Sequence, residues 1–486
     1  MARILRTVWV RPGAPVHPRT YHPRATQDSV LVQLLRDHLD AFLERCAVDG
    51  TPGLPVFVER ELRAMVACGD VSRGFVRLEC ADCRGPRVVP FSCKTHLCPS
   101  CAGRRMAEQA CHLVDRVLPR APYRQWVLTL PWQVARAAAY DARLCGRVFA
   151  IFADEVGRWQ RTRARKLGVE APRAGAVLEI QRFADGLQLF VHAHLLAPDG
   201  VFHETSDGRV RWRGIGPPTV EAVETVVGRV TARVRRLLER QASTADADGP
   251  GPASEHPLLE QCADVAPSRR VTMPGWADRR ARSRGRRARK PLCVRSPEGL
   301  EVHAAVHVTA ADRAGLQRLC QYLARPPICE DRLVRLPGGA VEVRLKRPRR
   351  GVRSLVFEPV AFLARMAALI WRPRLNMRRY YGVLSAAHSW RARVVPSPPC
   401  PDKTGKPVAP RRPARMGWAD LLKRTWNIDS LRCPFCQGRL RVVSAVLDPT
   451  AIQAIIAAVH LADGRAAEAA RHPASQVRGP PVQAAA

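Results

Sequence analysis

Two histidines separated by one alanine, His192 and His194, are spaced to bind a metal ion. The surrounding residues 187–196 (LQLFVHAHLL) are typical of a buried β-strand. Because side chains alternate along a strand, both imidazoles leave the same face, a few ångströms apart. Two such rings can hold one divalent ion with coordination positions left open, although two histidines can also meet by chance. A third ligand could come from one of three polar residues on expected strands: Gln181, His303 or His307.

Tyr322 lies on an expected helix over residues 311–324, with Arg318 and Arg325 about one turn to either side. A tyrosine has an apolar ring and a polar hydroxyl, so it can simply pack its ring and keep its hydroxyl in water. Taken alone, Tyr322 therefore has an ordinary structural explanation. A functional role for Tyr322 would require the fold to place a reactive group opposite it.

Two CxxC motifs, Cys80-Ala-Asp-Cys83 and Cys98-Pro-Ser-Cys101, are separated by residues 84–97. Each motif turns two thiolates toward one ion, and four thiolates in a tetrahedron form a structural zinc site. The spacing predicts one structural Zn²⁺ with four ligands: Cys80, Cys83, Cys98 and Cys101. Three residues close by could replace a ligand or extend the site: Cys68, Cys93 and His96. Chance or redox-active thiols are the alternative.

A third CxxC motif, Cys433-Pro-Phe-Cys436, is not followed by a second pair. An ion there would need ligands from elsewhere in the chain, and Cys400 is one candidate. The chain has sixteen cysteines, several of them in CxxC pairs. In a chain of this length, that pattern is typical of metal ligands in a reducing compartment rather than of a disulfide framework.

The charge of the chain indicates a polyanionic partner. Lysine and arginine number 79 against 43 acidic residues, a formal net charge of +36 over 486 residues. A GC-rich genome would explain arginine in place of lysine but not the shortage of acids, so nucleic acid is favoured over a membrane surface. The sequence has neither an apolar run of about 18 residues nor an N-terminal leader pattern, which predicts a cytoplasmic protein without membrane association.

The elements expected to position these residues include both strands and helices, and we expect an α+β fold with an antiparallel sheet. Strands are expected at residues 126–130, 176–182, 187–196, 300–308 and 381–384. Helices are expected at residues 29–45, 106–118, 135–167, 217–240, 311–324 and 359–370. Asp185-Gly186 between two of the strands predicts a hairpin that presents the histidine pair.

Composition shifts along the chain predict five segments. Residues 242–295, which contain a Pro- and Gly-rich stretch and the basic run from Arg279 to Lys290, are expected to be a flexible basic insertion. The other expected segments are a basic arm (1–28), a helical and zinc-binding N-terminal domain (29–120), a catalytic domain (121–241 plus 296–395), and a linker with a small CxxC module and a disordered tail (396–486).

The combination of these motifs resembles the rolling-circle (HUH) transposases of the insertion sequence 91 class. The matching stretches follow in the same order: FSCKTHLCPSCAGRRMAE, RQWVLTLP, EIQRFADGLQLFVHAHLLAPDGVF, LQRLCQYLARPP and VFEPVAFLARMAALIWRPRLNMRRYYGVL. The resemblance implies the HUH endonuclease fold, a Rep/relaxase-like antiparallel sheet with helices covering one face. A small zinc-binding domain is expected to precede it.

The resemblance also implies a mechanism. A catalytic Mg²⁺ or Mn²⁺ on His192 and His194 would polarise the scissile phosphate. The Tyr322 hydroxyl would attack in line and give a 5′-phosphotyrosine intermediate with a free 3′-hydroxyl, so strand joining needs no ATP. The expected partner is single-stranded DNA at transposon ends and target.

One position departs from the class. Founding members carry two tyrosines four residues apart on this helix, whereas here the position four before Tyr322 is Arg318. The chain therefore resembles the single-tyrosine branch, in which a homodimer or reuse of Tyr322 would process the second strand. Tyr380 and Tyr381 are expected to be structural or to stack on DNA. The alternative functions are a plasmid replication initiator or relaxase with the same chemistry, and a non-enzymatic zinc-dependent DNA-binding protein.

Overall fold

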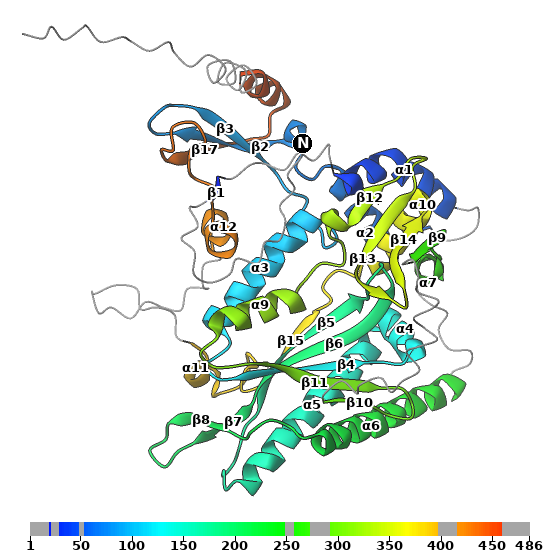
Figure 1. Cartoon of the computed structure of the whole chain (residues 1–486), viewed down its shortest axis with the longest axis vertical. Coiled ribbons are helices and arrows are strands. Elements are labelled where there is room, and N and C mark those ends of the chain that lie inside the picture. The colour runs from blue at the N-terminus through cyan, green and yellow to red at the C-terminus, as the bar shows by residue number, and fades with distance from the viewer. Residues whose placement is uncertain are drawn as a thin grey trace, which may run out of the picture. The chain divides into compact units, whose positions relative to one another are not determined.

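The computed structural model describes residues 19–20, 29–47, 53–247, 257–272, 292–396 and 416–458 (Figure 1). Contacts along the chain divide it into two compact units. The larger unit holds a six-stranded and a four-stranded sheet, and the smaller unit holds a three-stranded sheet. The structure is a mixed α+β one with antiparallel sheets, as the sequence predicts. Within the part of the chain that the structure describes, no helix combines the length and apolar composition needed to cross a membrane.

The six-stranded sheet has the strand order β10-β11-β4-β6-β5-β15, and every neighbouring pair is antiparallel. Its strands are β4 (Tyr123–Thr129), β5 (Gly175–Phe183), β6 (Leu189–Pro198), β10 (Cys293–Arg295), β11 (Glu301–Val308) and β15 (Arg378–Gly382). The β5–β6 hairpin turns at the predicted Asp185-Gly186, where Gly186 has a φ of +77°, a conformation that favours glycine. This register puts β6, with the histidine pair, inside the sheet rather than at an edge.

One face of this sheet is apolar and lies under α4 (Trp132–Tyr140), α5 (Ala142–Lys166) and α6 (Val220–Ala247). From β6, Val191, Ala193 and Leu195 enter this core together with residues from all three helices. The single helix predicted over 135–167 is divided in two. The break occurs at Asp141, whose side chain accepts from the first backbone N–H groups of α5 and caps that helix.

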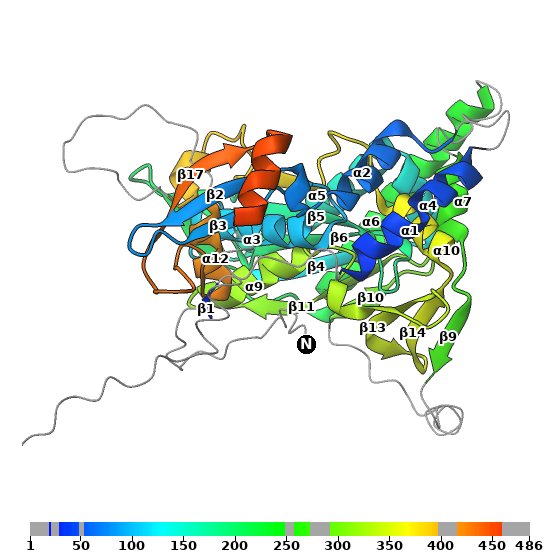
Figure 2. The ribbon, with the colours of Figure 1, turned by 90° about the horizontal axis from the view of Figure 1, so that it is seen from above.

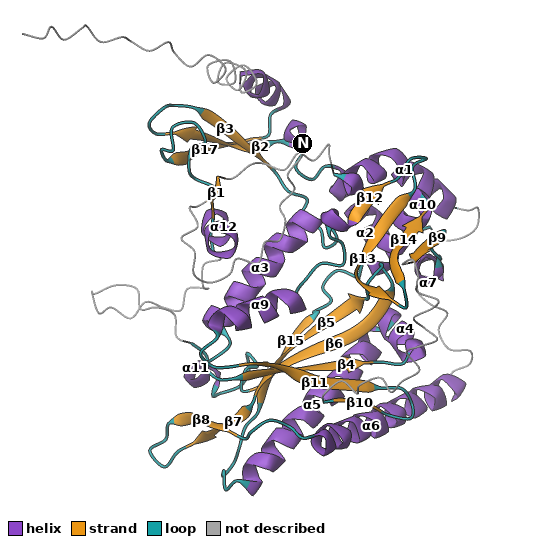
Figure 3. Cartoon of the chain, viewed as in Figure 1, coloured by secondary structure: helices purple, strands orange, loops and turns teal. Residues whose placement is uncertain are grey.

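The opposite face of the sheet lies under α3 (Pro99–Arg116) and α9 (Arg313–Leu323), as Figure 3 shows. Leu196 of β6 packs there against apolar residues of α3 and α9, such as Leu113 and Leu316. Helices thus cover both faces, whereas one covered face was expected. Because side chains alternate along β6, His192 and His194 point to the same face as Leu196, below α9.

The four-stranded sheet has the order β12-β13-β14-β9. Its strands are β12 (Leu333–Arg335), β13 (Val341–Arg349), β14 (Val352–Phe357) and β9 (Arg269–Thr272). Figure 2 shows β13, β14 and β9 side by side, with α7 (Pro257–Asp264) and α10 (Pro359–Leu369) next to them. Helices α1 (Val30–Cys46) and α2 (Val56–Val66) contact each other, and α1 also contacts α10. Because α7 and β9 fall within residues 242–295, the segment expected to be flexible contributes regular structure, while its basic run 279–290 lies outside the described residues.

The smaller unit is built around a three-stranded sheet of β2 (Phe75–Cys80), β3 (Pro86–Pro90) and β17 (Leu440–Val446), with β2 in the middle. It also contains α12 (Trp418–Trp426), β16 (Ile428–Asp429) and the short β1 (Arg19–Thr20) that pairs with it. The C-terminal CxxC module, expected to be separate, therefore shares a sheet with residues 75–90. Most of the expected basic arm and the tail from residue 459 lie outside the described residues.

Candidate active site and metal centres

The histidine pair lies in the middle of the six-stranded sheet, on the face toward α9. The ring centroids of His192 and His194 are 5.0 Å apart, and the two residues are 9% and 4% exposed. On β5, Gln181 lies opposite His192 and Glu179 lies opposite His194. The pair is therefore shielded from bulk water and has polar neighbours in the next strand.

Hydrogen bonds orient both imidazoles. Nδ1 of His192 donates to the carbonyl of Phe190 over 3.1 Å, which leaves Nε2 as the free nitrogen. Nδ1 of His194 lies 2.7 Å from the side-chain amide of Gln125. Nε2 of His194 is buried and has no hydrogen-bond partner among the described residues. Since unpaired buried polar atoms are rare in proteins, this nitrogen fits a ligand to a bound ion.

Electrostatics keep both rings neutral. Burial, with the nearby charge of Arg325, lowers the pKa of His192 to about 4. Burial, then His192 and Arg325, lowers the pKa of His194 well below its ordinary value. At neutral pH both imidazoles are therefore unprotonated, which is the form that coordinates metals.

Gln181 connects the sheet to the end of α9. Its side-chain nitrogen donates to the carbonyl of Leu323 over 2.6 Å and to that of Tyr322 over 3.3 Å. Its oxygen is buried and has no hydrogen-bond partner in the described part of the chain. Of the three residues considered for a third ligand, Gln181 thus offers an unpaired oxygen beside His192, whereas Nε2 of His307 lies 3.5 Å from the carboxylate of Asp199. His303 lies on β11 opposite Val127, which in turn lies opposite His194.

Tyr322 lies over the histidine pair, as the resemblance described from the sequence motifs implies. Its ring centroid is 5.9 Å from that of His194, with the ring planes at 81°, and the residue is 37% exposed. Helix α9 is held in place by Leu316, Leu319 and Leu323, which pack into the core shared with α3. Tyr322 therefore contacts the buried histidine pair and is also partly exposed to solvent.

Two cations stand over the tyrosine ring. The guanidinium carbon of Arg325 is 4.5 Å from the ring centroid, and Nζ of Lys346, from β13, is 5.1 Å from it. Cations over a tyrosine ring attract it, and here they also place positive charge next to the ring. Arg318, the other arginine noted on this helix, lies 3.7 Å from Asp312 instead.

The sequence patterns did not predict that Lys346 belongs to this site. The position of Lys346 depends on Asp185 in the β5–β6 turn. The Asp185 carboxylate accepts from the backbone N–H of Lys346 and from Arg332, each over 2.8 Å. The hairpin that carries the histidines therefore also holds the strand that carries the lysine. The only local signal was the Asp-Gly pair itself, which predicts a turn but not its partners.

Tyr380 and Tyr381 lie on β15, at an edge of the sheet. Tyr380 packs with the α3–α9 core and Tyr381 with the opposite core. The guanidinium carbon of Arg391 is 5.6 Å from the Tyr380 ring centroid. Among the tyrosines of the described residues, Tyr322 is the one whose ring contacts His194.

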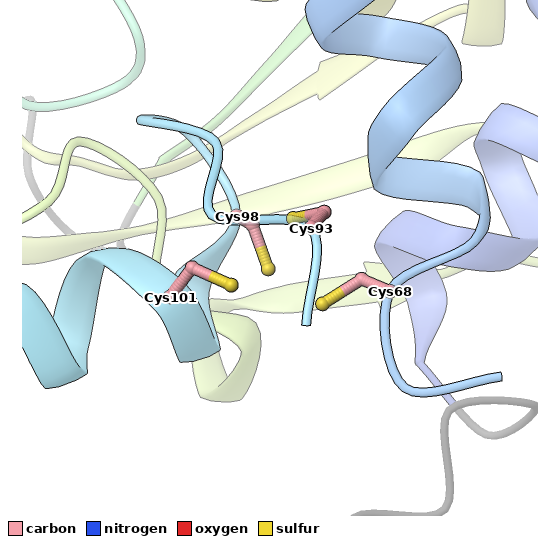
Figure 4. A group of neighbouring side chains, drawn as sticks. All are labelled: Cys68, Cys93, Cys98 and Cys101. Atoms are coloured by element: carbon pink, nitrogen blue, oxygen red, sulfur yellow. The ribbon is translucent and has the colours of Figure 1, made fainter. Parts of the chain in front are cut away.

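The structure does not bring the four expected zinc ligands together. Cys98 and Cys101 instead group with Cys68 and Cys93, with all four sulfurs within 4.8 Å of one another. Figure 4 shows these side chains gathered at the start of α3, where Cys98 is the N-cap residue. His96, the other nearby candidate, has its Nδ1 3.2 Å from Glu61.

Cys80 and Cys83 group with Cys433 and Cys436, again within 4.8 Å. The reason is the pairing of β2 with β17, which brings residues about 350 apart in the chain together. Spacing along the sequence cannot reveal such a pairing, and it led to the wrong grouping of two adjacent motifs. Cys400, proposed as a partner for the C-terminal motif, lies outside the described residues. None of the described cysteines forms a disulfide.

Comparison with protein families gives two matches. A family model described as "Putative transposase" matches residues 175–392, which include His192, His194 and Tyr322. A second, described as "Transposase zinc-binding domain", matches residues 34–130, which include the first six clustered cysteines. No curated protein and no solved structure matches the chain significantly. The zinc-binding match and the two thiol clusters together indicate bound Zn²⁺.

Proposed function

Since the chain belongs to the insertion sequence 91 family of transposases, we propose that it nicks and joins single-stranded DNA through a covalent bond to Tyr322. DNA is the substrate of a transposase, and cleavage and joining of DNA are its general reaction. The observation that carries the proposal is the position of the Tyr322 ring, 5.9 Å from that of His194 at the buried histidine pair. A non-enzymatic zinc-dependent DNA-binding protein would have no need of this arrangement.

In the proposed nicking step, the Tyr322 oxygen attacks a backbone phosphorus. A bond forms between that oxygen and phosphorus, and the bond from phosphorus to the 3′-oxygen breaks. The phenol loses its proton and the departing 3′-oxygen gains one, leaving a 5′-phosphotyrosine and a 3′-hydroxyl. Joining is the reverse attack by a 3′-hydroxyl, and the covalent intermediate conserves the energy of the broken bond.

Arg325 and Lys346 are proposed to bind the phosphate at the reaction centre. Both cations lie over the ring of Tyr322, whose hydroxyl oxygen would form the new bond. Positive groups held in place before reaction stabilise the charge that develops on the phosphate oxygens. Arg325 also restricts the orientation of the ring by stacking on it.

His192, His194 and Gln181 are proposed to hold a divalent ion, Mg²⁺ or Mn²⁺. The unpaired Nε2 of His194 and the unpaired oxygen of Gln181 support this ligand set. Binding at Nε2 requires the His194 proton on Nδ1. The Gln125 amide nitrogen lies 2.7 Å from Nδ1, so the amide would turn over on metal binding and its oxygen would accept a hydrogen bond from Nδ1–H. When bound, such an ion acts as a Lewis acid toward a phosphate oxygen.

The six-stranded antiparallel sheet, with the histidine pair on an inner strand and the tyrosine helix over it, supports the HUH endonuclease fold. A single nucleophile is proposed, because the position one turn before Tyr322 is Arg318, which lies near Asp312. The second strand would then be processed by reuse of Tyr322 or by a second subunit of a homodimer. Cys68, Cys93, Cys98 and Cys101 are proposed to hold a structural Zn²⁺.

The test uses single-stranded oligonucleotides from the ends of the element that encodes the chain, with Mg²⁺ or Mn²⁺. The wild type should form a covalent protein–DNA adduct visible after denaturation. Tyr322→Phe should abolish the adduct, while Tyr380→Phe and Tyr381→Phe, which remove hydroxyls away from the histidine pair, should retain it. An adduct that persists in Tyr322→Phe would refute the proposed nucleophile.

A further inference from the structure

The second thiol cluster lies at one end of the three-stranded sheet, and we propose that it is a zinc site that attaches the C-terminal segment to residues 75–90. Its members are Cys80, Cys83, Cys433 and Cys436. Two of them lie beyond both family matches, which end at residues 130 and 392. This site is separate from the proposed DNA chemistry, because none of its residues belongs to the six-stranded sheet.

The sulfur–sulfur distances fit one tetrahedral ion. The sulfurs of Cys80 and Cys436 are 3.5 Å apart, and those of Cys83 and Cys433 are 3.7 Å apart. Four sulfurs about 2.3 Å from a central zinc would lie about 3.8 Å from one another. A disulfide would require a separation of about 2.0 Å. The cluster therefore has the size of a four-thiolate zinc site.

The two CxxC motifs have the same backbone conformation. The N–H of Cys80 donates to the carbonyl of Gly85, and the N–H of Cys433 donates to that of Gly438. One turn along, the N–H of Arg84 donates to the carbonyl of Cys80. In the second motif, the N–H of Gln437 donates in the same way to the carbonyl of Cys433. Two segments that are remote in sequence thus form matching loops, each presenting two thiols to the same point.

Both loops contain a glycine beside a thiol. A Cβ on Gly85 would lie 3.3 Å from the Cys83 sulfur, and one on Gly438 would collide with the Asp82 carboxylate and lie 3.1 Å from the Cys436 sulfur. The N–H of Gly438 also points to the Cys436 sulfur, over 3.4 Å. Backbone N–H groups directed at a sulfur favour the thiolate, which is the form that binds metal.

The apolar core beside the cluster is small. Its buried members are Leu78, Cys80, Cys433 and Leu440. The strand pairing adds a bond from the N–H of Ala81 to the carbonyl of Arg439, over 2.9 Å. A second small core, of Phe75, Val446 and Ile452, joins the same two segments. Small cores of this kind are commonly reinforced by a metal or another cross-link. Four soft thiolate ligands select zinc over Mg²⁺ or Mn²⁺.

Zinc content measures the site directly. The wild-type chain, purified with zinc and freed of loosely bound metal, should hold two Zn²⁺ per chain by elemental analysis. Cys433→Ser with Cys436→Ser should hold one fewer, while Cys293→Ser, a half-buried cysteine in neither cluster, should match the wild type. Equal zinc content in the wild type and the double variant would overturn the proposal, whatever the outcome of the adduct assay.

Alkylation of the unmodified protein gives a test that does not depend on variants folding. Cys83 and Cys436 are exposed, so burial alone does not protect them. With zinc bound, their reaction with a dilute alkylating reagent should be slow, and removal of zinc by a chelator should accelerate it at least about tenfold, because a bound thiolate is a weaker nucleophile. The alkylation rate of each cysteine is measured by mass spectrometry. Equal rates before and after chelation would contradict a shared ion.

Discussion

The nitrogen atoms of the histidine pair are held by neighbours that leave one coordinating atom free on each ring. Phe190 binds one imidazole and Gln125 the other, and burial keeps both neutral. Arg325 contributes to the lowered pKa values and also stands over Tyr322. In the proposed site, the same cation therefore favours neutral imidazoles on one side and adds positive charge beside the tyrosine on the other.

Gln125→Ala tests how far the orientation of His194 supports metal binding. Loss of a hydrogen bond to a metal-bound imidazole typically weakens metal affinity about 10- to 100-fold. We expect the Mn²⁺ concentration for half-maximal adduct formation to rise by a factor in that range, with adduct recovered at high Mn²⁺. Gln160→Ala is the control, because this buried glutamine binds the Pro198 carbonyl instead. An unchanged Mn²⁺ dependence in Gln125→Ala would count against the metal role of His194.

Lys346→Met tests the positive charge over the tyrosine. The substitution keeps an unbranched chain and removes the ammonium group 5.1 Å from the Tyr322 ring centroid. We expect the adduct to form at least about tenfold more slowly, because a charge aimed at the reacting phosphate is lost. Lys166→Met, at the C-terminal end of α5, removes the same charge elsewhere and should keep the wild-type rate. Equal rates in the two variants would show that Lys346 contributes only to overall charge.

The β5–β6 hairpin is the element on which the proposed site depends. Its strands carry Gln181 and the histidine pair, and its turn holds β13 through Asp185. Gln181 also binds the end of α9. One supersecondary unit therefore contacts each of the other elements that supply functional groups.

Asp185→Ala tests this coupling. The variant loses the acceptor for Arg332, in a half-buried setting, and for the Lys346 backbone, in an exposed one. We expect it to be less stable by about 1–3 kcal/mol in denaturant unfolding. Adduct formation should also be slower, since Lys346 is no longer held. Asp207→Ala, in the exposed turn between β7 (Gly200–Glu204) and β8 (Val210–Gly214), is the matched control and should change neither property. Wild-type adduct rates in Asp185→Ala would contradict the coupling.

Local patterns predicted the elements of the site, but not their partners. The apolar run around the histidines and the helical spacing around Tyr322 are properties of neighbouring residues, so β6 and α9 could be predicted from the sequence. The break at Asp141 was missed because one capping side chain ended a continuous apolar pattern. Lys346 was missed because its position depends on a hydrogen bond to a residue 161 positions away.

At the scale of the whole molecule, the cysteines also show that local sequence patterns do not reveal which distant residues come together. The sequence predicted thiolate zinc sites but grouped adjacent motifs, whereas β2 pairs with a strand near the end of the described chain. The formal charge of +36 accords with a DNA substrate, which the family match establishes in general terms. The structural zinc sites and the histidine–tyrosine site use different residues, so metal analysis and adduct formation test them separately.

The most direct test of the account is to identify the residue that becomes bonded to DNA. The wild-type adduct would be digested with nuclease and trypsin and analysed by tandem mass spectrometry. The account predicts a nucleotide phosphate on Tyr322, in the peptide that begins at Leu319 after cleavage at Arg318. A nucleotide on any other residue, or cleavage of the oligonucleotide without a covalent protein adduct, would contradict it.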